Sequence, residues 1–129
     1  MTKLSPRGPI ATAIDADRNS RLLRISFNDG RSYQLPFEYL RVHSPSAEVQ
    51  GHGNPKLVAH KKEVGITTIE AVGNYAVKIC FDDGHDSGIY TWQWLYILGR
   101  DYDKLWADYL GSLRAARSSR EPLLAFKLL

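Results

Sequence analysis

The chain carries two copies of one short pattern, and this repeat limits the folds that are open to it. In each copy an Asp-Gly pair, Asp29-Gly30 or Asp83-Gly84, separates two runs rich in apolar residues, and a short helical segment follows. An Asp-Gly pair between such runs is typical of a tight hairpin, because the turn needs residues with positive φ. The repeat therefore predicts two related hairpin–helix units and an α+β fold with an antiparallel, twisted sheet.

The same patterns predict where the individual elements lie. Strands are expected over residues 11–16, 22–27, 32–35, 66–72, 75–81 and 88–90, and helices over 37–40 and 92–98. Thr91 and Asp101 are the expected caps of the helices that follow them. Apolar residues at the helical period predict a C-terminal amphipathic helix; they are Tyr102, Leu105, Trp106, Tyr109, Leu110 and Leu113. Residues 42–63 contain several Gly and Pro and are expected to be irregular.

The 129 residues suit one domain. We expect a disordered segment over residues 1–9, the repeat domain over 10–99, and the last helix with an apolar tail over 100–129. The tail either docks on the domain or meets a partner. No window has the length of a membrane span, and the first nine residues lack the apolar run of a signal peptide. These patterns predict a cytoplasmic protein without membrane contact.

The charge distribution raises the question of nucleic-acid binding. Residues 1–62 carry ten Lys and Arg against five Asp and Glu, whereas residues 63–129 carry seven against nine. The cations of the basic half are scattered, however, and no aromatic–basic pattern typical of RNA recognition is present. The sequence thus favours a solvated basic surface over a nucleic-acid interface.

The candidates for chemistry are few. Cys80 is the single cysteine, which excludes an internal disulfide, and its place in a predicted strand favours a buried structural thiol. His85 lies among the carboxylates of Asp82-Asp-Gly-His-Asp86, a set that could bind a divalent cation or move protons. Turn geometry explains the aspartates, so only His85 is left without a structural reason.

The other histidines, His43, His52 and His60, are nine and eight residues apart, which matches no fixed ligand motif. No histidine is followed at the second position by Asp or Glu, as the usual non-haem iron triad requires. The sequence also lacks a phosphate-binding loop, a nucleophile elbow and a Cys-x-x-Cys pair. We therefore expect no enzyme activity.

Two blocks of this sequence resemble the γ-butyrobetaine hydroxylase N-terminal-like family, formerly DUF971. They are Leu40-Arg-Val-His-Ser-Pro-Ser-Ala-Glu-Val-Gln-Gly-His52 and Phe81-Asp-Asp-Gly-His-Asp-Ser-Gly-Ile-Tyr-Thr-Trp92. The resemblance covers about residues 10–99. In this family the domain occurs as small stand-alone bacterial proteins, and also fused to carnitine-pathway dioxygenases and to some iron–sulfur carrier ATPases.

The resemblance also bears on metal binding. In the dioxygenases three cysteines and the histidine of an Asp-Gly-His motif bind a structural zinc ion. The cysteines fall on Ser44, Ser46 and Val49 of this chain, and the histidine falls on His85. Hydroxyls are poor zinc ligands and valine is none, so the resemblance implies that the zinc site is lost. The further metal candidates are His43 and His52.

Together these observations predict a non-catalytic binding or adaptor module that needs no cofactor and has an unidentified protein partner. The expected interaction surface consists of Ser44, Ser46, Glu48, His52, His85 and Asp86. Trp92 and Trp94 belong either to this surface or to the core. The alternative hypothesis is a metal-binding accessory protein that uses His85 with zinc or iron, in an iron–sulfur or oxygenase system.

Overall fold

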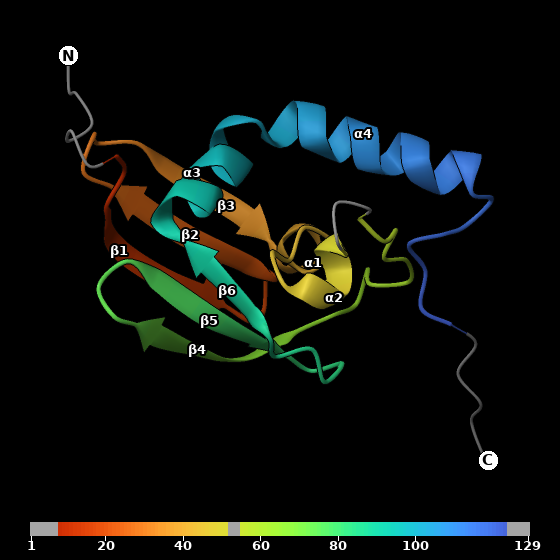
Figure 1. Cartoon of the computed structure of the whole chain (residues 1–129), viewed down its shortest axis with the longest axis horizontal. Helices are drawn as coiled ribbons and strands as arrows, with labels where there is room; N and C mark the ends of the chain where they lie inside the picture. The colour runs from red at the N-terminus through yellow and green to blue at the C-terminus, as the bar shows by residue number, and fades with distance from the viewer. Residues whose placement is uncertain (1–7, 52–54, 124–129) are drawn as a thin grey trace.

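The computed structural model describes residues 8–51 and 55–123, and Figure 1 shows how their elements are arranged. The first sheet consists of β1 (Ala11–Asp17), β2 (Leu22–Phe27) and β3 (Ser32–Pro36). The second consists of β4 (Ile66–Val72), β5 (Ala76–Phe81) and β6 (Gly88–Thr91). The helices are α1 (Phe37–Val42), α2 (Ala47–Gln50), α3 (Trp92–Arg100) and α4 (Tyr102–Ala115). The predicted α+β class and C-terminal helix are confirmed, and each repeat unit forms an antiparallel sheet of its own.

The two units match each other at their hairpin turns. The Arg31 N–H donates to Asp29 Oδ1 at 2.9 Å, and the His85 N–H donates to Asp83 Oδ1 at 3.0 Å. Gly30 and its counterpart in the second turn have φ angles of 85° and 90°. The positive φ that the Asp-Gly pattern predicts is thus confirmed in both copies.

The helix termini follow the local sequence in part. Thr91 Oγ1 accepts a hydrogen bond from the Trp94 N–H at 3.1 Å, so this predicted cap is confirmed. Asp101 precedes α4, but its carboxylate makes no cap bond and instead accepts from Arg100.

The expectation that residues 42–63 lack any regular element was wrong. They contain α2, a single helical turn between an extended Ser46 and a Gly51 with φ of 55°. This turn lies between Pro45 and Gly51, which exclude a longer helix. Its Val49 is buried, and this burial adds a tertiary contact to a turn too short to be stable alone.

The apolar faces of both sheets and of helices α1 and α3 form one core, which includes Leu23, Ile25, Phe27, Leu40, Ile79, Phe81, Leu95 and Leu98. Two fully buried tyrosines cross this core with their hydroxyls satisfied. Tyr39 donates to the Leu98 carbonyl at 2.7 Å, and Tyr90 donates to the Leu40 carbonyl at 2.6 Å. These bonds fix α1 against the second unit.

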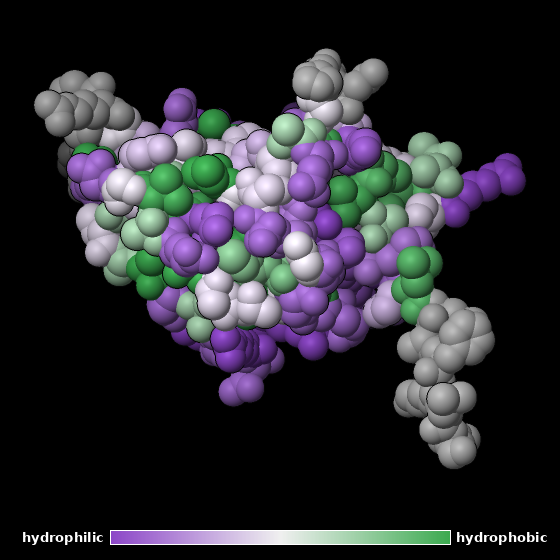
Figure 2. All heavy atoms as spheres, turned by 60° about the horizontal axis from the view of Figure 1, so that its bottom comes forward, coloured by the Kyte–Doolittle hydropathy of each residue, from purple (hydrophilic) through white to green (hydrophobic). Residues whose placement is uncertain are grey.

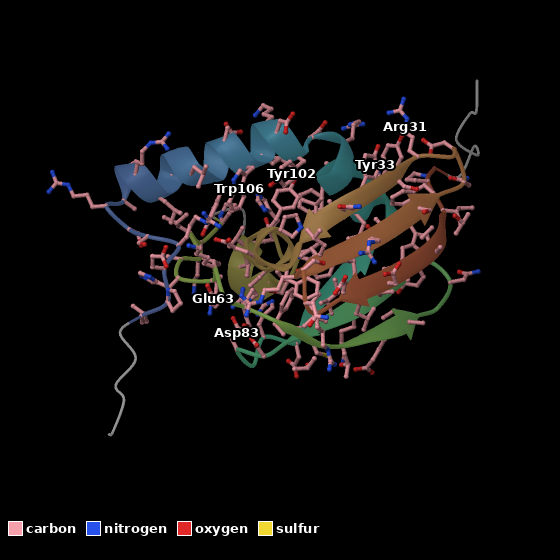
Figure 3. The ribbon with its side chains drawn as sticks, turned by 180° about the vertical axis from the view of Figure 1, so that it is seen from behind. Arg31, Tyr33, Glu63, Asp83, Tyr102 and Trp106 are labelled. Atoms are coloured by element: carbon pink, nitrogen blue, oxygen red, sulfur yellow. The ribbon has the colours of Figure 1, made fainter. Side chains whose placement is uncertain are left out.

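Helix α4 lies against α1, and Figure 3 shows Tyr102 and Trp106 on its inner side. The rings of Tyr39 and Tyr102 lie 4.7 Å apart in an edge-to-face arrangement. Tyr109 and Leu113 are buried in a second cluster with Val42. The predicted amphipathic stripe therefore packs against helix α1 and the segment at Val58 and Ala59. No helix in the described ranges is both long and apolar enough to cross a bilayer.

The outer faces of the sheets carry polar side chains. Arg24 of β2 pairs with Asp15 and Asp17 of β1, at 3.1 and 3.2 Å. In Figure 2, which brings the lower side of Figure 1 forward, hydrophilic residues separate the hydrophobic ones into small patches. The functional site is therefore sought where helices and turns meet.

Candidate functional site

The segment between α1 and α2 meets the β5–β6 turn at one corner of the molecule. We call Ser44, Ser46, Glu48 and His85 the His85 corner. His85 Nε2 lies 2.8 Å from Ser44 Oγ and 3.4 Å from Ser46 Oγ, while Nδ1 lies 3.5 Å from Glu48 Oε2. This loop and His85 were expected to meet because both follow or interrupt equivalent hairpin–helix units and because the family resemblance pairs them, and the distances confirm that placement. The loop's His52 lies outside the described residues.

Three of the four residues of the corner are closed to solvent, although all three were expected in the interaction surface. The exposed fractions of Ser44, Ser46 and His85 are 0%, 5% and 6%. These three residues therefore cannot form a contact surface. Glu48 and Asp86 are exposed and remain available to a partner.

Charge and burial keep the His85 ring neutral. Burial lowers the pKa of His85, and the nearby Arg41 cation lowers it further, against the opposing effect of the Glu48 carboxylate. A neutral ring that places Nδ1–H toward Glu48 leaves Nε2 to accept from the Ser44 hydroxyl. The Gln50 side chain also donates to the Ser44 carbonyl at 2.8 Å, which joins α2 to the corner.

The turn beneath the ring is held by an ion cluster around Asp83. Asp83 Oδ2 accepts from Arg41 Nε at 2.8 Å and lies 2.7 Å from Lys61 Nζ. Burial opposes ionisation of Asp83, but bonds from Lys61, the His85 N–H and Arg41 outweigh it and lower its pKa to about 2. The cluster explains the acidic turn as a structural feature that positions His85.

The order Ser44–His85–Glu48 resembles a nucleophile, a base and an orienting acid. Two observations argue against catalysis. Ser44 has no exposed surface for a substrate to approach, and its Oγ also accepts the Ser46 N–H at 3.3 Å. The Glu48 side chain is 71% exposed, so it does not fix the ring as a buried acid would. The arrangement instead joins α2 to the β5–β6 turn.

The donors at this corner do not fit the zinc ion that the family resemblance implies. Tetrahedral zinc holds nitrogen and oxygen ligands about 3.3 Å apart, given bonds near 2.0 Å. Ser44 Oγ and His85 Nε2 are in direct hydrogen-bond contact at 2.8 Å, and Val49 offers a buried apolar side chain. Nor does any other group of three or more His, Cys, Asp or Glu in the described ranges assemble a metal site.

The other described histidines are bonded elsewhere. His43 Nδ1 lies 2.9 Å from the Tyr39 carbonyl, and His60 Nδ1 lies 2.8 Å from the Glu121 carbonyl. Cys80 is half-buried, with Sγ 3.6 Å from the Glu70 carboxylate. The structure therefore does not gather the remaining metal and thiol candidates with His85.

Gly88 leaves the space that the Ser44 hydroxyl occupies in the corner, a role that the sequence analysis did not find. A Cβ atom at Gly88 would lie 2.6 Å from Ser44 Oγ, so any other residue would displace that hydroxyl. In the second sheet Gly88 is the cross-strand neighbour of Ile79. In the first sheet the neighbour of the equivalent Ile25 is Tyr33, so Tyr33 is the counterpart of Gly88. The difference between the two copies at this position was the available signal.

The fold agrees with the comparisons with known proteins. The model of the γ-butyrobetaine hydroxylase-like, N-terminal family matches residues 14–96, and the chain belongs to this family. A search of proteins with curated descriptions gave no match.

Solved structures similar to this chain include two NMR structures and one crystal structure. One solution NMR structure is 53% identical with a TM-score of 0.80, and the match covers 100% of this chain and 97% of that one. A second NMR structure is 50% identical with a TM-score of 0.79, over 94% and 97% of the two chains. A crystal structure of a DUF971 protein of unknown function from Acidithiobacillus ferrooxidans is 35% identical with a TM-score of 0.60, over 69% and 91%. The first of these matches extends through α4, beyond the family model.

Proposed function

We propose that this chain is a non-catalytic adaptor that binds another protein through the surface around α2. The closed His85 corner carries the proposal. Its serine has no exposed surface and bonds directly to the histidine, so the grouping most like a catalytic or metal site serves to position α2. What α2 then presents to solvent is its outer side, with Ala47 and Glu48, next to the exposed Asp86 of the turn.

Site-specific photo-cross-linking in living cells tests this proposal. A benzophenone amino acid at Ala47 or Asp86, both exposed, should give a discrete adduct with a partner protein. The same amino acid at Gln34, an exposed residue of β3, is the matched control and should give none. Equal labelling from all three positions, or from none, would contradict the proposed surface. The captured partner is then purified and its binding measured by calorimetry, where Asp86→Arg should weaken it.

The alternative of a metal-binding accessory protein is tested by elemental analysis. Because hydroxyls and a valine stand where thiolates would be needed, we expect well under one zinc or iron ion per chain. The triple variant Ser44→Cys, Ser46→Cys, Val49→Cys is the matched positive control and should gain zinc. A stoichiometric metal ion in the unmodified protein, whose removal by chelator unfolds it, would support the alternative instead.

A further inference from the structure

A groove runs between α2 and α4. It has a volume of about 260 Å³, and Val42, Val49, Leu105 and Tyr109 contribute apolar side chains to its lining. A second hollow of about 230 Å³ adjoins it, lined by Pro45, Gln50 and Trp94. Gln50 and Trp94 line both. The Trp94 Nε1–H donates to the His43 carbonyl at 3.0 Å, so this shared wall is fixed in place.

His43 gives the groove an unused hydrogen-bond acceptor. Its Nδ1 lies 2.9 Å from the Tyr39 carbonyl, which can only accept, so Nδ1 carries the proton. Nε2 therefore holds a lone pair. Nε2 has no hydrogen-bond partner among the described residues, and it is accessible to solvent in a ring that lines the groove. Burial lowers the pKa of His43, although the Tyr39 carbonyl opposes this, and the ring stays neutral.

The rim of the groove has one cation without a counter-charge. Lys56 is exposed and makes no ion pair with any described residue. Among the described residues that line the groove, Asp108 is the only one with a carboxylate, and it is already paired with Lys104 at 2.6 Å. The rim therefore favours a ligand with a negative charge.

The size of the two hollows indicates what can fill them. Sites for small molecules and cofactors usually enclose about 300–1,000 Å³. Each hollow here is smaller, and two adjoining hollows with a shared wall suit neighbouring side chains of one extended peptide.

We propose that this groove binds an extended segment of a partner protein that contains Tyr or Trp beside an acidic residue. The aromatic ring occupies the larger hollow and donates its O–H or N–H to His43 Nε2. The acidic residue pairs with Lys56, and an apolar neighbour packs on Trp94 and Pro45. This inference rests on the proposed adaptor function and names the chemistry of its partner.

The tautomer of His43 is the first test. Long-range ¹⁵N–¹H correlation spectra of the full chain at neutral pH should show a protonated Nδ1 and an unprotonated Nε2. A protonated Nε2 would remove the acceptor and overturn the proposal.

Peptide titrations are the second test. The probes are acetyl-Pro-Trp-Glu-amide and acetyl-Glu-Trp-Pro-amide, followed by NMR of the ¹⁵N-labelled protein. For at least one of the two chain directions, saturable shifts should concentrate at the Trp94 indole, the His43 ring and the amides of residues 42–50 and 105–112. Replacing Trp by Phe, or Glu by Lys, should each weaken binding about fivefold, as expected for one lost hydrogen bond or charge contact.

Protein variants complete the test without altering the core. Lys56→Glu should weaken binding about fivefold, whereas Lys78→Glu, the same change on the outer face of the second sheet, should not. Shifts spread over the whole surface, no saturable shift, or affinity unchanged by both Lys56→Glu and the Trp-to-Phe peptide would overturn the proposal. A cross-linked partner together with peptides that fail to bind would reject this groove and keep the adaptor function. Peptide binding without any cross-linked partner would support this groove as a peptide site and reject the proposed adaptor surface around α2.

Discussion

Ser44 satisfies two groups with one hydroxyl, because its Oγ lies 2.8 Å from His85 Nε2 and also accepts the Ser46 N–H. Ser44→Ala should lower the free energy of unfolding by about 1–3 kcal/mol, since a buried ring nitrogen would keep only a 3.4 Å contact to Ser46. Ser26→Ala is the control, because Ser26 bonds to Ser32 on an outer sheet face, and it should cost under about 0.5 kcal/mol. Urea unfolding measures both. A Ser44 variant no less stable than the Ser26 variant would contradict the role given to the corner.

Burial of His43 and His85 predicts that the free energy of unfolding falls in mild acid. The pKa values of His85 and His43 are both lowered by burial, so below about pH 6.5 the unfolded chain binds protons more readily than the folded one. Stability should therefore fall as the pH decreases from 6.5 toward the folded pKa values. The contribution of Asp83, whose pKa is about 2, is lost only below about pH 4, so the two effects separate.

Urea unfolding at a series of pH values between 7.5 and 4.5 checks this prediction. A His43→Gln, His85→Gln double variant should show a flatter dependence than the unmodified chain. Stability that stays constant or rises from pH 7 to pH 5 would show that neither ring resists protonation in the folded state.

The composition of the site was predictable, but its burial was not. The resemblance placed Ser44, Ser46 and His85 together, because it mapped each onto one zinc ligand. Their exposure depends instead on Gly88, whose missing side chain lets the Ser44 hydroxyl reach the ring. That contact joins segments from different units, and in the sequence only the difference between the two copies at this position points to it.

At the scale of elements, the hairpin turns depend on two glycines. Gly30→Val and Gly84→Val should each lower the free energy of unfolding by about 1–3 kcal/mol, because both positions have φ near 90°. A Cβ at Gly84 would meet no atom within 4 Å, so its cost is conformational and not steric. Gly84→Asn should therefore cost less than Gly84→Val, since Asn tolerates positive φ. Thermal or urea unfolding measures the series, and equal losses for Asn and Val would contradict this explanation.

Elements with a strong local pattern were predicted with their full bounds. The expected strands 22–27 and 66–72 coincide with β2 and β4. The single turn of α2 was missed because four residues give no helical period. It is held by Val49 in the core and by contacts of Glu48 and Gln50 with the corner, which are tertiary interactions.

At the scale of the whole molecule, the two units hold each other by reciprocal contacts. Tyr39 of α1 donates to the carbonyl of Leu98 in α3, while Trp94 of α3 donates to the carbonyl of His43 after α1. The turns behave in the same way, because Asp29 of the first unit accepts from Tyr96 of α3, and Asp83 of the second accepts from α1. Each turn is thus bonded to the helix of the other unit, so we expect the two units to unfold together.

The chain beyond α4 is joined to residues 60–62 by backbone hydrogen bonds and a Lys62–Glu121 ion pair, and to α1 by a second ion pair. Arg120 donates to both carboxylate oxygens of Glu38 at 2.9 and 2.7 Å, and its guanidinium lies 5.1 Å from the centre of the Trp106 ring. Figure 3 places Trp106 on the inner side of α4, where this contact closes over α1. The Glu38 side chain is 7% exposed, whereas that of Arg120 is 36% exposed, so water screens the pair only from one side.

Arg120→Met should therefore lower the free energy of unfolding by about 1–3 kcal/mol, because it leaves a buried carboxylate without its partner, although solvent near Arg120 limits the loss. Glu38→Gln, combined with Arg120→Met in a double-mutant cycle, should give a coupling energy of about 1–2 kcal/mol. Arg117→Met removes an exposed cation from the same segment and should cost under about 0.5 kcal/mol. Urea unfolding of the four members of the cycle provides the measurement. A coupling energy near zero would mean that the Arg120–Glu38 pair does not stabilise the C-terminal segment against α1.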